Sequence, residues 1–174
     1  MRLVFMGTPD FAVPSLQALY HREHQILGVI SQPDRPRGRG QKMLPPPVKK
    51  TALELGLAVK QPTTNDEILA SLECWQPEIV VVVAYGRILS PSVLDLPARG
   101  CINLHASLLP RYRGAAPIHR AVMNGETETG VTTMWMAAQM DAGDIILQEK
   151  MLIPFTANVG QIHDKLVIKG AELL

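Results

Sequence analysis

Residues 79–85 read IVVVVAY, a run of apolar side chains between Pro77 and Gly86. A continuous apolar run without polar alternation is typical of a strand in a parallel sheet that is covered on both faces. The run is far shorter than the ~20 residues that span a bilayer. Ligands bind beyond the carboxyl ends of such strands, so Tyr85, Gly86 and Arg87 lie where a ligand is expected. A packing role is the alternative for Tyr85.

Strand and helix patterns alternate on both sides of this run. Strands are predicted at 3–6, 26–31, 58–61, 101–105, 130–136 and 145–153. Helices are predicted at 11–20, 48–55, 66–75 and 115–124 and from 161 onward, with Asn65 as the N-cap of the third. This order predicts an α/β protein with a Rossmann-like, open and mostly parallel sheet, flanked by helices and with a mixed edge.

A tight turn, GTPD at residues 7–10, follows the first strand. Gly7 invites a dinucleotide-binding interpretation, but that fingerprint needs three glycines at fixed spacing. Asp10 would also repel a phosphate group. We therefore favour a turn that borders the active cleft over a pyrophosphate site.

The composition fits one domain, with 174 residues and 47% hydrophobic content. Two cysteines, Cys74 and Cys101, are too few for a disulfide framework or a zinc site. The N-terminus runs directly into a strand pattern without the features of a signal peptide. We expect a cytoplasmic monomer without a membrane segment. No helix-ending signal precedes Leu174, so we also expect a domain cut from something longer.

Residues 32–47, QPDRPRGRGQKMLPPP, interrupt the alternation with five prolines and two glycines. This composition predicts an extended surface loop without regular elements. Positive charge is concentrated here, because residues 34–50 hold six basic residues and one acidic residue while the net charge of the chain is +1. Two interpretations stay open: a solvated charged loop, and a flexible arm whose arginines contact phosphates.

The stretch CINLHASLLPRYRGAAPI, residues 101–118, has the layout of a site. Side chains of a strand alternate, so Asn103 and His105 should share one face. An amide can donate a hydrogen bond to a developing oxyanion, an imidazole can transfer a proton, and a carboxylate such as Asp141 can tune the imidazole. These roles suit acyl-type transfer to an amine. A structural histidine and a simple turn aspartate are the alternative.

Two further chemistries are disfavoured. Ser107 lies close to His105 in sequence, but no glycine elbow surrounds it, so a supporting role in the loop fits better than a nucleophile. The histidines at 105, 119 and 163 lie far apart without carboxylates at ligand spacing, so no metal site is predicted.

The string NLHASLLPRYRGAAPI, residues 103–118, closely resembles the signature of the folate-dependent formyltransferases, and MDAGDII at 140–146 resembles the second segment of that family. Three other stretches resemble the members of the family that act on methionyl-initiator tRNA: GTPDFA at 7–12, QPDRPRGRGQK at 32–42 and VVVVAYG at 80–86. The resemblance spans essentially the whole chain, with several independent motifs in the right order.

The resemblance implies that residues 1–174 are a formyltransferase catalytic domain with a Rossmann-like fold. The implied reaction moves a formyl group from the co-substrate 10-formyltetrahydrofolate to the α-amino group of methionyl-initiator tRNA, without a metal. Asn103 and the His105 imidazolium would stabilise the oxyanion, and Asp141 would hold His105 charged and relay a proton, through water. The residues implied to contact the folate are Ser107, Leu108, Leu109, Pro110, Tyr85 and Gly86.

The resemblance also favours the second interpretation of the basic loop. The residues implied to contact the tRNA are Arg35, Arg37, Arg39 and Lys42, with Arg39 as the first choice. The resemblance also implies a C-terminal β-barrel domain that adds a tRNA surface, and we expect residues 1–174 to lack it. The alternatives are a formyltransferase that acts on a small amine, either a nucleotide sugar or a purine precursor, and a non-catalytic RNA-binding domain.

Overall fold

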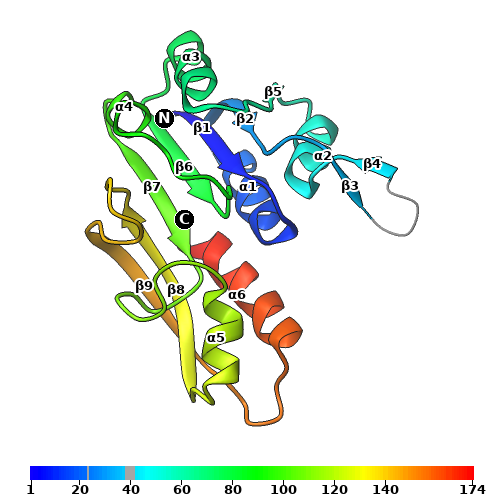
Figure 1. Ribbon diagram of the computed structural model, residues 1–174, viewed down its shortest axis with the longest axis vertical. Helices are drawn as coiled ribbons and strands as arrows, with labels where there is room; N and C mark the ends of the chain where they lie inside the picture. Colours follow the sequence, from blue (N-terminus) through cyan, green and yellow to red (C-terminus); the bar gives the residue numbers. More distant parts are fainter. Residues whose placement is uncertain (23, 38–41) are drawn as a thin grey trace.

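The computed structural model describes residues 1–22, 24–37 and 42–174. A seven-stranded sheet in the order β5-β2-β1-β6-β7-β8-β9 forms its centre (Figure 1). The strands are β1 (Arg2–Gly7), β2 (Gln25–Ile30), β5 (Val59–Lys60), β6 (Ile79–Val83), β7 (Cys101–His105), β8 (Glu128–Trp135) and β9 (Ile145–Leu152). The helices are α1 (Val13–Tyr20), α2 (Pro47–Glu54), α3 (Asn65–Trp75), α4 (Pro91–Asp95), α5 (Pro117–Met123) and α6 (Val159–Leu173), with a short 3-10 helix, η1 (Asp10–Ala12), before α1.

The sheet is mostly parallel with a mixed edge, as predicted. Strands β5, β2, β1, β6 and β7 run parallel, while β8 is antiparallel to both of its neighbours. The chain moves outward from β1 to β2 and β5 and then returns to the other side of β1 to form β6. At such a switch point the loops leave in opposite directions and open a crevice at the carboxyl ends of the strands.

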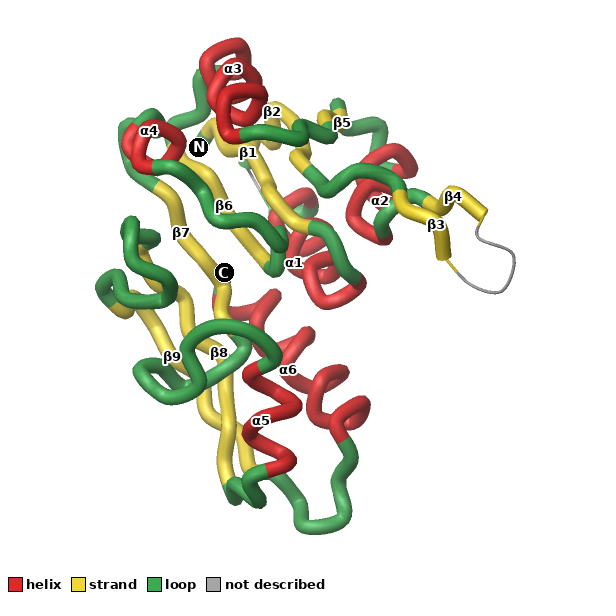
Figure 2. Tube along the Cα trace, viewed as in Figure 1, coloured by secondary structure: helices red, strands yellow, loops and turns green. Residues whose placement is uncertain are grey.

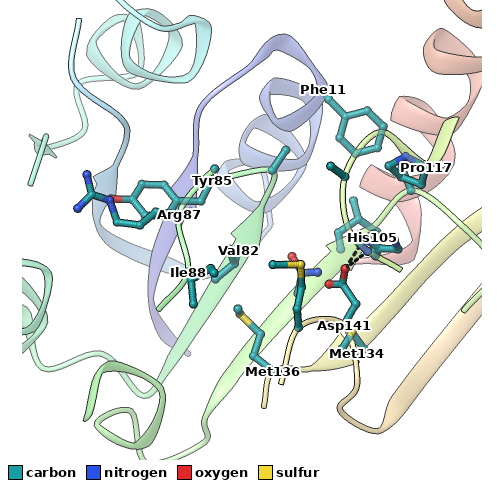
Figure 3. A pocket seen from close by; sticks show the side chains of 18 of the residues that line it. Phe11, Val82, Tyr85, Arg87, Ile88, His105, Pro117, Met134, Met136 and Asp141 are labelled. Atoms are coloured by element: carbon teal, nitrogen blue, oxygen red, sulfur yellow. Dashed lines mark hydrogen bonds and ion pairs between the residues drawn. The ribbon is translucent and has the colours of Figure 1, made fainter. Parts of the chain in front are cut away.

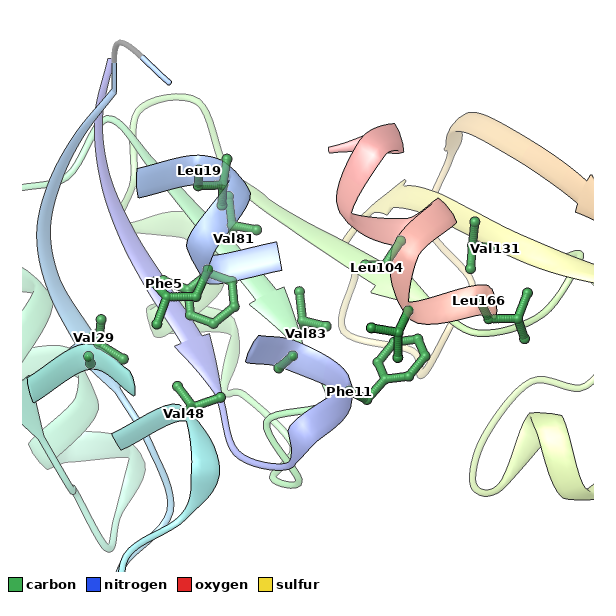
Figure 4. Packing of buried hydrophobic residues seen from close by; sticks show 14 of the residues in the cluster. Phe5, Phe11, Leu19, Val29, Val48, Val81, Val83, Leu104, Val131 and Leu166 are labelled. Atoms are coloured by element: carbon green, nitrogen blue, oxygen red, sulfur yellow. The ribbon is translucent and has the colours of Figure 1, made fainter. Parts of the chain in front are cut away.

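Helices cover both faces of the sheet, which explains the continuous apolar run of β6. Val81 and Val83 pack in a cluster with residues of α1, α2 and α6 (Figure 4). Val80 and Val82 point the other way, into a second cluster with residues of α3 and α4. Every residue of β6 is therefore buried.

Strand β7 shows the alternation that the sequence predicted. Ile102 and Leu104 pack with the first cluster, and Cys101 belongs to the second. Asn103 and His105 share the face of Cys101, because side chains two residues apart lie on the same side of a strand. Both polar side chains therefore point away from the core that Leu104 enters.

Residues 32–47 contain regular structure, so the prediction of a loop without elements was wrong. Strand β3 (Arg35–Arg37) pairs with β4 (Lys42–Leu44) in a separate antiparallel sheet that projects from the body (Figures 1 and 2). Both strands of a two-stranded ribbon have a free edge, so Pro36 can lack its N–H without breaking a ladder. Proline content alone was therefore a poor argument against strands here.

The N-cap of α3 also differs from the prediction. Thr64, rather than Asn65, accepts a hydrogen bond from the backbone N–H of Glu67, at 3.2 Å. Asn65 is the first helical residue, and its side-chain oxygen accepts from the N–H of Ser90 at 3.1 Å. Thr and Asn are both good caps, so only the extended backbone of Thr64 decides between them. Among the helices that the structure describes, none has the length and apolar character to cross a membrane.

Candidate active site

A cavity of about 780 Å³ lies beyond the carboxyl ends of β1, β6 and β7. Its walls come from the turn after β1 (residues 9–11), the loop after β6 (84–89), the start of α5 (117–119) and the end of β8 with the loop that follows (134–141). The place matches the switch point of the sheet, and the volume lies within the roughly 300–1,000 Å³ that small-molecule pockets span.

The three predicted catalytic residues meet in this cavity. Asn103 and His105 line it from β7, and Asp141 lines it from the loop after β8. Figure 3 shows His105 and Asp141 facing each other. Strand β8 pairs antiparallel with β7, with Trp135 opposite Ile102 and Thr132 opposite His105, so β8 ends beside the start of β7. The loop that follows β8 then carries Asp141 back along β7 to His105.

His105 is buried, and contacts at both ring nitrogens hold it. Nδ1 lies 3.6 Å from Oδ2 of Asp141, and Nε2 lies 3.0 Å from the carbonyl oxygen of Tyr112. A carbonyl only accepts, so the second contact requires a proton on Nε2. The Asp141 carboxylate faces the other ring nitrogen, Nδ1.

A backbone N–H of the loop after β7 holds the Asp141 carboxylate in place. Its Oδ2 accepts a hydrogen bond from the N–H of Gly114 at 2.8 Å. The same oxygen faces His105, so the carboxylate joins the loop after β7 to the loop after β8. The side chain of Asp141 is 14% exposed, which leaves it access to the cavity.

Strained backbone gathers around the cavity. Ala84, Ala116 and Asp141 line it with positive φ angles of 46°, 51° and 49°, and Tyr112, whose carbonyl faces His105, has φ 58°. Such conformations cost about 1–3 kcal/mol each for residues other than glycine. They are found where the surrounding structure imposes a functional geometry.

A polar network supports the loop that carries Tyr112, and the sequence analysis missed it. Glu126 accepts hydrogen bonds from the Tyr112 hydroxyl and from the Arg111 guanidinium. The hydrogen bond from Tyr112 and then that from Arg111 lower the pKa of the Glu126 carboxyl below its ordinary value. No local pattern could identify Glu126, because it lies in a different loop from its two partners. The one local sign of an unusual turn in this segment is Gly114, which adopts a φ of 83° in the structure.

The predicted folate contacts divide into two groups. Tyr85 and Gly86 line the cavity, and Tyr85 also packs in the second core cluster, where burial raises the pKa of its phenol. The segment from Ser107 to Pro110 does not line the cavity. Its polar contacts are structural: the Ser107 hydroxyl donates to the carbonyl of Arg111 at 2.6 Å, and the Leu109 N–H donates to the Thr132 hydroxyl at 3.2 Å.

The predicted tRNA contacts lie on the β3–β4 ribbon. Arg35 and Lys42 are exposed there. Arg37 lies opposite Lys42, so positions 35 and 42 share one face of the ribbon. Arg39 lies outside the described residues.

Among the residues that the structure describes, no group of three or more His, Cys, Asp or Glu side chains is placed to hold a metal ion.

Comparison with known proteins identifies the kind of molecule that this site belongs to. The family model described as formyl transferase matches residues 1–174. The chain is 72% identical over 176 residues to the methionyl-tRNA formyltransferase of Moorella thermoacetica, and 56% identical over 176 residues to that of Pelotomaculum thermopropionicum. All of this chain is covered in both, but only 57% and 56% of those two proteins. The chain thus spans little more than half the length of these relatives.

Solved structures with the same fold include glycinamide ribonucleotide transformylase 1 from Symbiobacterium toebii, with a TM-score of 0.82, 19% identity and coverage of 99% of this chain and 83% of that one. Another is phosphoribosylglycinamide formyltransferase from Streptococcus pneumoniae, with a TM-score of 0.81, 21% identity and coverage of 99% of this chain and 93% of that one. At these identities the likeness concerns the fold alone.

Proposed function

This chain belongs to the formyl transferase family, and we propose that it transfers a formyl group from 10-formyltetrahydrofolate to the α-amino group of methionine esterified to initiator tRNA. The observation that carries the proposal is the meeting of Asn103, His105 and Asp141 in one cavity. The acceptor is inferred from the relatives named methionyl-tRNA formyltransferase, which match the chain over its whole length. We place the reaction in the cytoplasm, where initiator tRNA is charged and used.

Each residue of the trio has a role that fits its position. The methionyl amine attacks the formyl carbon, a new C–N bond forms, and the bond from that carbon to the folate N10 breaks. Asn103 donates a hydrogen bond to the formyl oxygen, and the nearby positive charge of the His105 imidazolium stabilises the negative charge that develops on it. Asp141 faces His105 at 3.6 Å and stabilises its charge, and it accepts the proton that the amine loses and passes it toward N10.

The cavity fits the folate co-substrate in size and character. A volume of about 780 Å³ accommodates a large fused ring, and most of the lining residues are apolar. Tyr85 and Gly86 lie on the wall formed by the loop after β6, which is the place we assign to the folate. We assign Ser107 to Pro110 a supporting role for the loop after β7, because their hydrogen bonds run to the backbone of Arg111 and to Thr132 of β8.

The basic ribbon supplies the proposed contact to RNA. Arg35 and Lys42 are exposed on one face of a hairpin that stands clear of the sheet (Figure 1). Cationic side chains on such a hairpin can neutralise backbone phosphates without reading sequence. We propose that residues 1–174 are the catalytic domain and that the ribbon is the part of this domain that contacts the tRNA.

Two rival functions are less well supported. A small phosphorylated amine needs a phosphate pocket, and the turn after β1 offers the Asp10 carboxylate in the cavity wall instead. The solved glycinamide ribonucleotide transformylases that share this fold are only 19–24% identical to this chain. A non-catalytic RNA-binding domain would have no need of the Asp141–His105 pair beside a strained backbone.

The test is a transfer assay with the complete protein that carries this chain. 10-Formyltetrahydrofolate is supplied with methionyl-initiator tRNA, with glycinamide ribonucleotide or with an amino sugar nucleotide. We expect transfer to the tRNA alone, and transfer near background for His105→Ala with tRNA affinity retained. Transfer to a small amine, or none to the tRNA by the unmodified protein, would refute the proposal.

A further inference from the structure

A partly buried cluster of polar side chains lies where the β3–β4 ribbon joins the body of the protein. Asp34 directly precedes β3, Lys49 lies in the first turn of α2 just after β4, and Gln61 directly follows β5. We call these three side chains the ribbon root. In Figure 1 the ribbon leaves the body beside α2, next to β5.

The ribbon root is tightly connected. Lys49 Nζ lies 2.8 and 2.9 Å from the two carboxylate oxygens of Asp34 and donates to Oε1 of Gln61 at 2.7 Å. Gln61 Nε2 donates to Oδ1 of Asp34 at 2.8 Å and to the carbonyl of Gln32 at 2.7 Å. The side chains of Lys49 and Asp34 are only 22% and 31% exposed. The start of the ribbon at Asp34, and helix α2 that follows the ribbon, are thereby tied to the end of β5.

Further hydrogen bonds connect the ribbon root to the active-site cavity. The N–H of Gln32 donates to the Thr8 hydroxyl at 3.4 Å, and that hydroxyl donates to the carbonyl of Tyr85 at 2.7 Å. Tyr85 lines the cavity. The root therefore holds the base of the ribbon in a fixed place relative to the site where the formyl group reacts.

The ribbon needs such an anchor because its strands pair only with each other among the described residues. Two strands alone form a marginally stable unit, and nothing in their own pairing sets their direction relative to the large sheet. An ion pair with shared hydrogen bonds fixes a direction better than a single flexible contact.

We propose that Asp34, Lys49 and Gln61 are positioning residues that aim the basic ribbon at the tRNA while its acceptor end lies in the cavity. This inference rests on the proposed function. The Lys49 and then the Gln61 hydrogen bonds lower the pKa of the Asp34 carboxyl, which keeps the pair ionised at neutral pH. The positioning role of the ribbon root differs from the proposed RNA contact of Arg35 and Lys42, since the charges of Asp34 and Lys49 pair with each other.

The test measures formylation of methionyl-initiator tRNA by the complete protein with Asp34→Ala, Lys49→Gln and the double variant. Each single change should raise KM for the tRNA by roughly tenfold, with kcat at saturating tRNA and KM for the folate unchanged. The double variant should be no worse than either single one, because both remove the same anchor. Lys49→Arg should recover most of the affinity.

The signs of the charges separate positioning from simple electrostatics. Asp34→Ala removes a negative charge, so long-range attraction alone predicts a lower KM for the tRNA, whereas lost positioning predicts a higher one. The matched control is Lys50→Gln, which removes a positive charge from the next residue of α2; Lys50 is 71% exposed and forms an ion pair with Glu54. A lower or unchanged KM for Asp34→Ala, or an equal rise for Lys50→Gln, would overturn the inference. Failure of the unmodified protein to formylate the tRNA would instead refute the proposed function.

Discussion

Asp141 Oδ2 lies 3.6 Å from Nδ1 of His105, although His105 ends strand β7 and Asp141 lies in the loop after the neighbouring strand β8. The separation is that of an ion pair and is too long for a good hydrogen bond. The carboxylate therefore acts on the imidazole mainly through its charge, while the Gly114 N–H holds it in place.

Removal of that charge is expected to slow the chemical step. Asp141→Asn keeps the size of the side chain and an acceptor for the Gly114 N–H, so the fold should remain intact. We expect kcat for formyl transfer to fall by roughly 10²–10³, because proton transfer and stabilisation of the imidazolium are both weakened. Asp144→Asn, an exposed residue of the same loop, is the control and should behave like the unmodified protein. Equal activity of the two variants would remove Asp141 from the mechanism.

The proposed RNA contact of the ribbon predicts a change in salt dependence. The double variant Arg35→Ala/Lys42→Ala should bind initiator tRNA more weakly, with a plot of log affinity against log salt that is shallower by roughly 1.5. Lys150→Ala/Lys165→Ala removes the same number of charges from exposed positions elsewhere. If both double variants lowered the slope equally, the ribbon would have no special part in RNA binding.

The Glu126 network predicts an acid-sensitive loop. The pKa of Glu126 is lowered from its ordinary 4.5, first by the Tyr112 hydroxyl and then by Arg111. The contribution of the ionised Glu126 to stability is therefore complete above pH 4.5, and it is lost as the pH falls through the lower pKa that Glu126 has in the folded protein. Glu126→Gln should be less stable at neutral pH but should lose less stability than the unmodified protein on acidification. Denaturant unfolding across this range measures the difference, and parallel curves would contradict it.

The two thiols are expected to differ sharply in reactivity. Cys101 is 3% exposed, and burial, with a smaller effect of Asp95, raises its pKa to about 12. Cys74 is exposed. Ellman's reagent should therefore modify one thiol rapidly in the native protein and both in denaturant, since only the thiolate reacts. The folded Cys74→Ser variant should show no rapid reaction with the reagent. Rapid modification of Cys101 in that variant would mean that the strand carrying it opens readily.

Gly7 is expected to be needed for packing at the turn after β1. A Cβ there would lie 2.8 Å from Cε1 of Phe5, 2.9 Å from Cβ of Ala12 and 3.0 Å from the carbonyl oxygen of Val83. Gly7→Ala should therefore lower the free energy of unfolding by about 1–3 kcal/mol. Gly160→Ala in α6, where the nearest atom would be 3.3 Å away, is the matched control. A neutral Gly7→Ala would show that the turn can shift, and the close-packing argument would fail.

Much of the fold could be predicted from local patterns. The apolar run of β6 requires cover on both faces, and the alternation of β7 separates Leu104 from His105. The β3–β4 ribbon was missed because its composition, rich in proline and glycine, matches that of a loop. Its pairing depends on a partner strand that no local pattern reveals.

The sequence by itself determined which side chains could do the chemistry, since Asn103 and His105 share a strand face through the period of a strand. Only the tertiary structure decided what surrounds them. Asp141 reaches His105 because the loop after β8 folds back from the start of β7 to its end, and Lys49 reaches Asp34 because α2 returns beside the base of the ribbon. Contacts between residues distant in the chain follow from how packed elements are placed, which no short stretch encodes on its own.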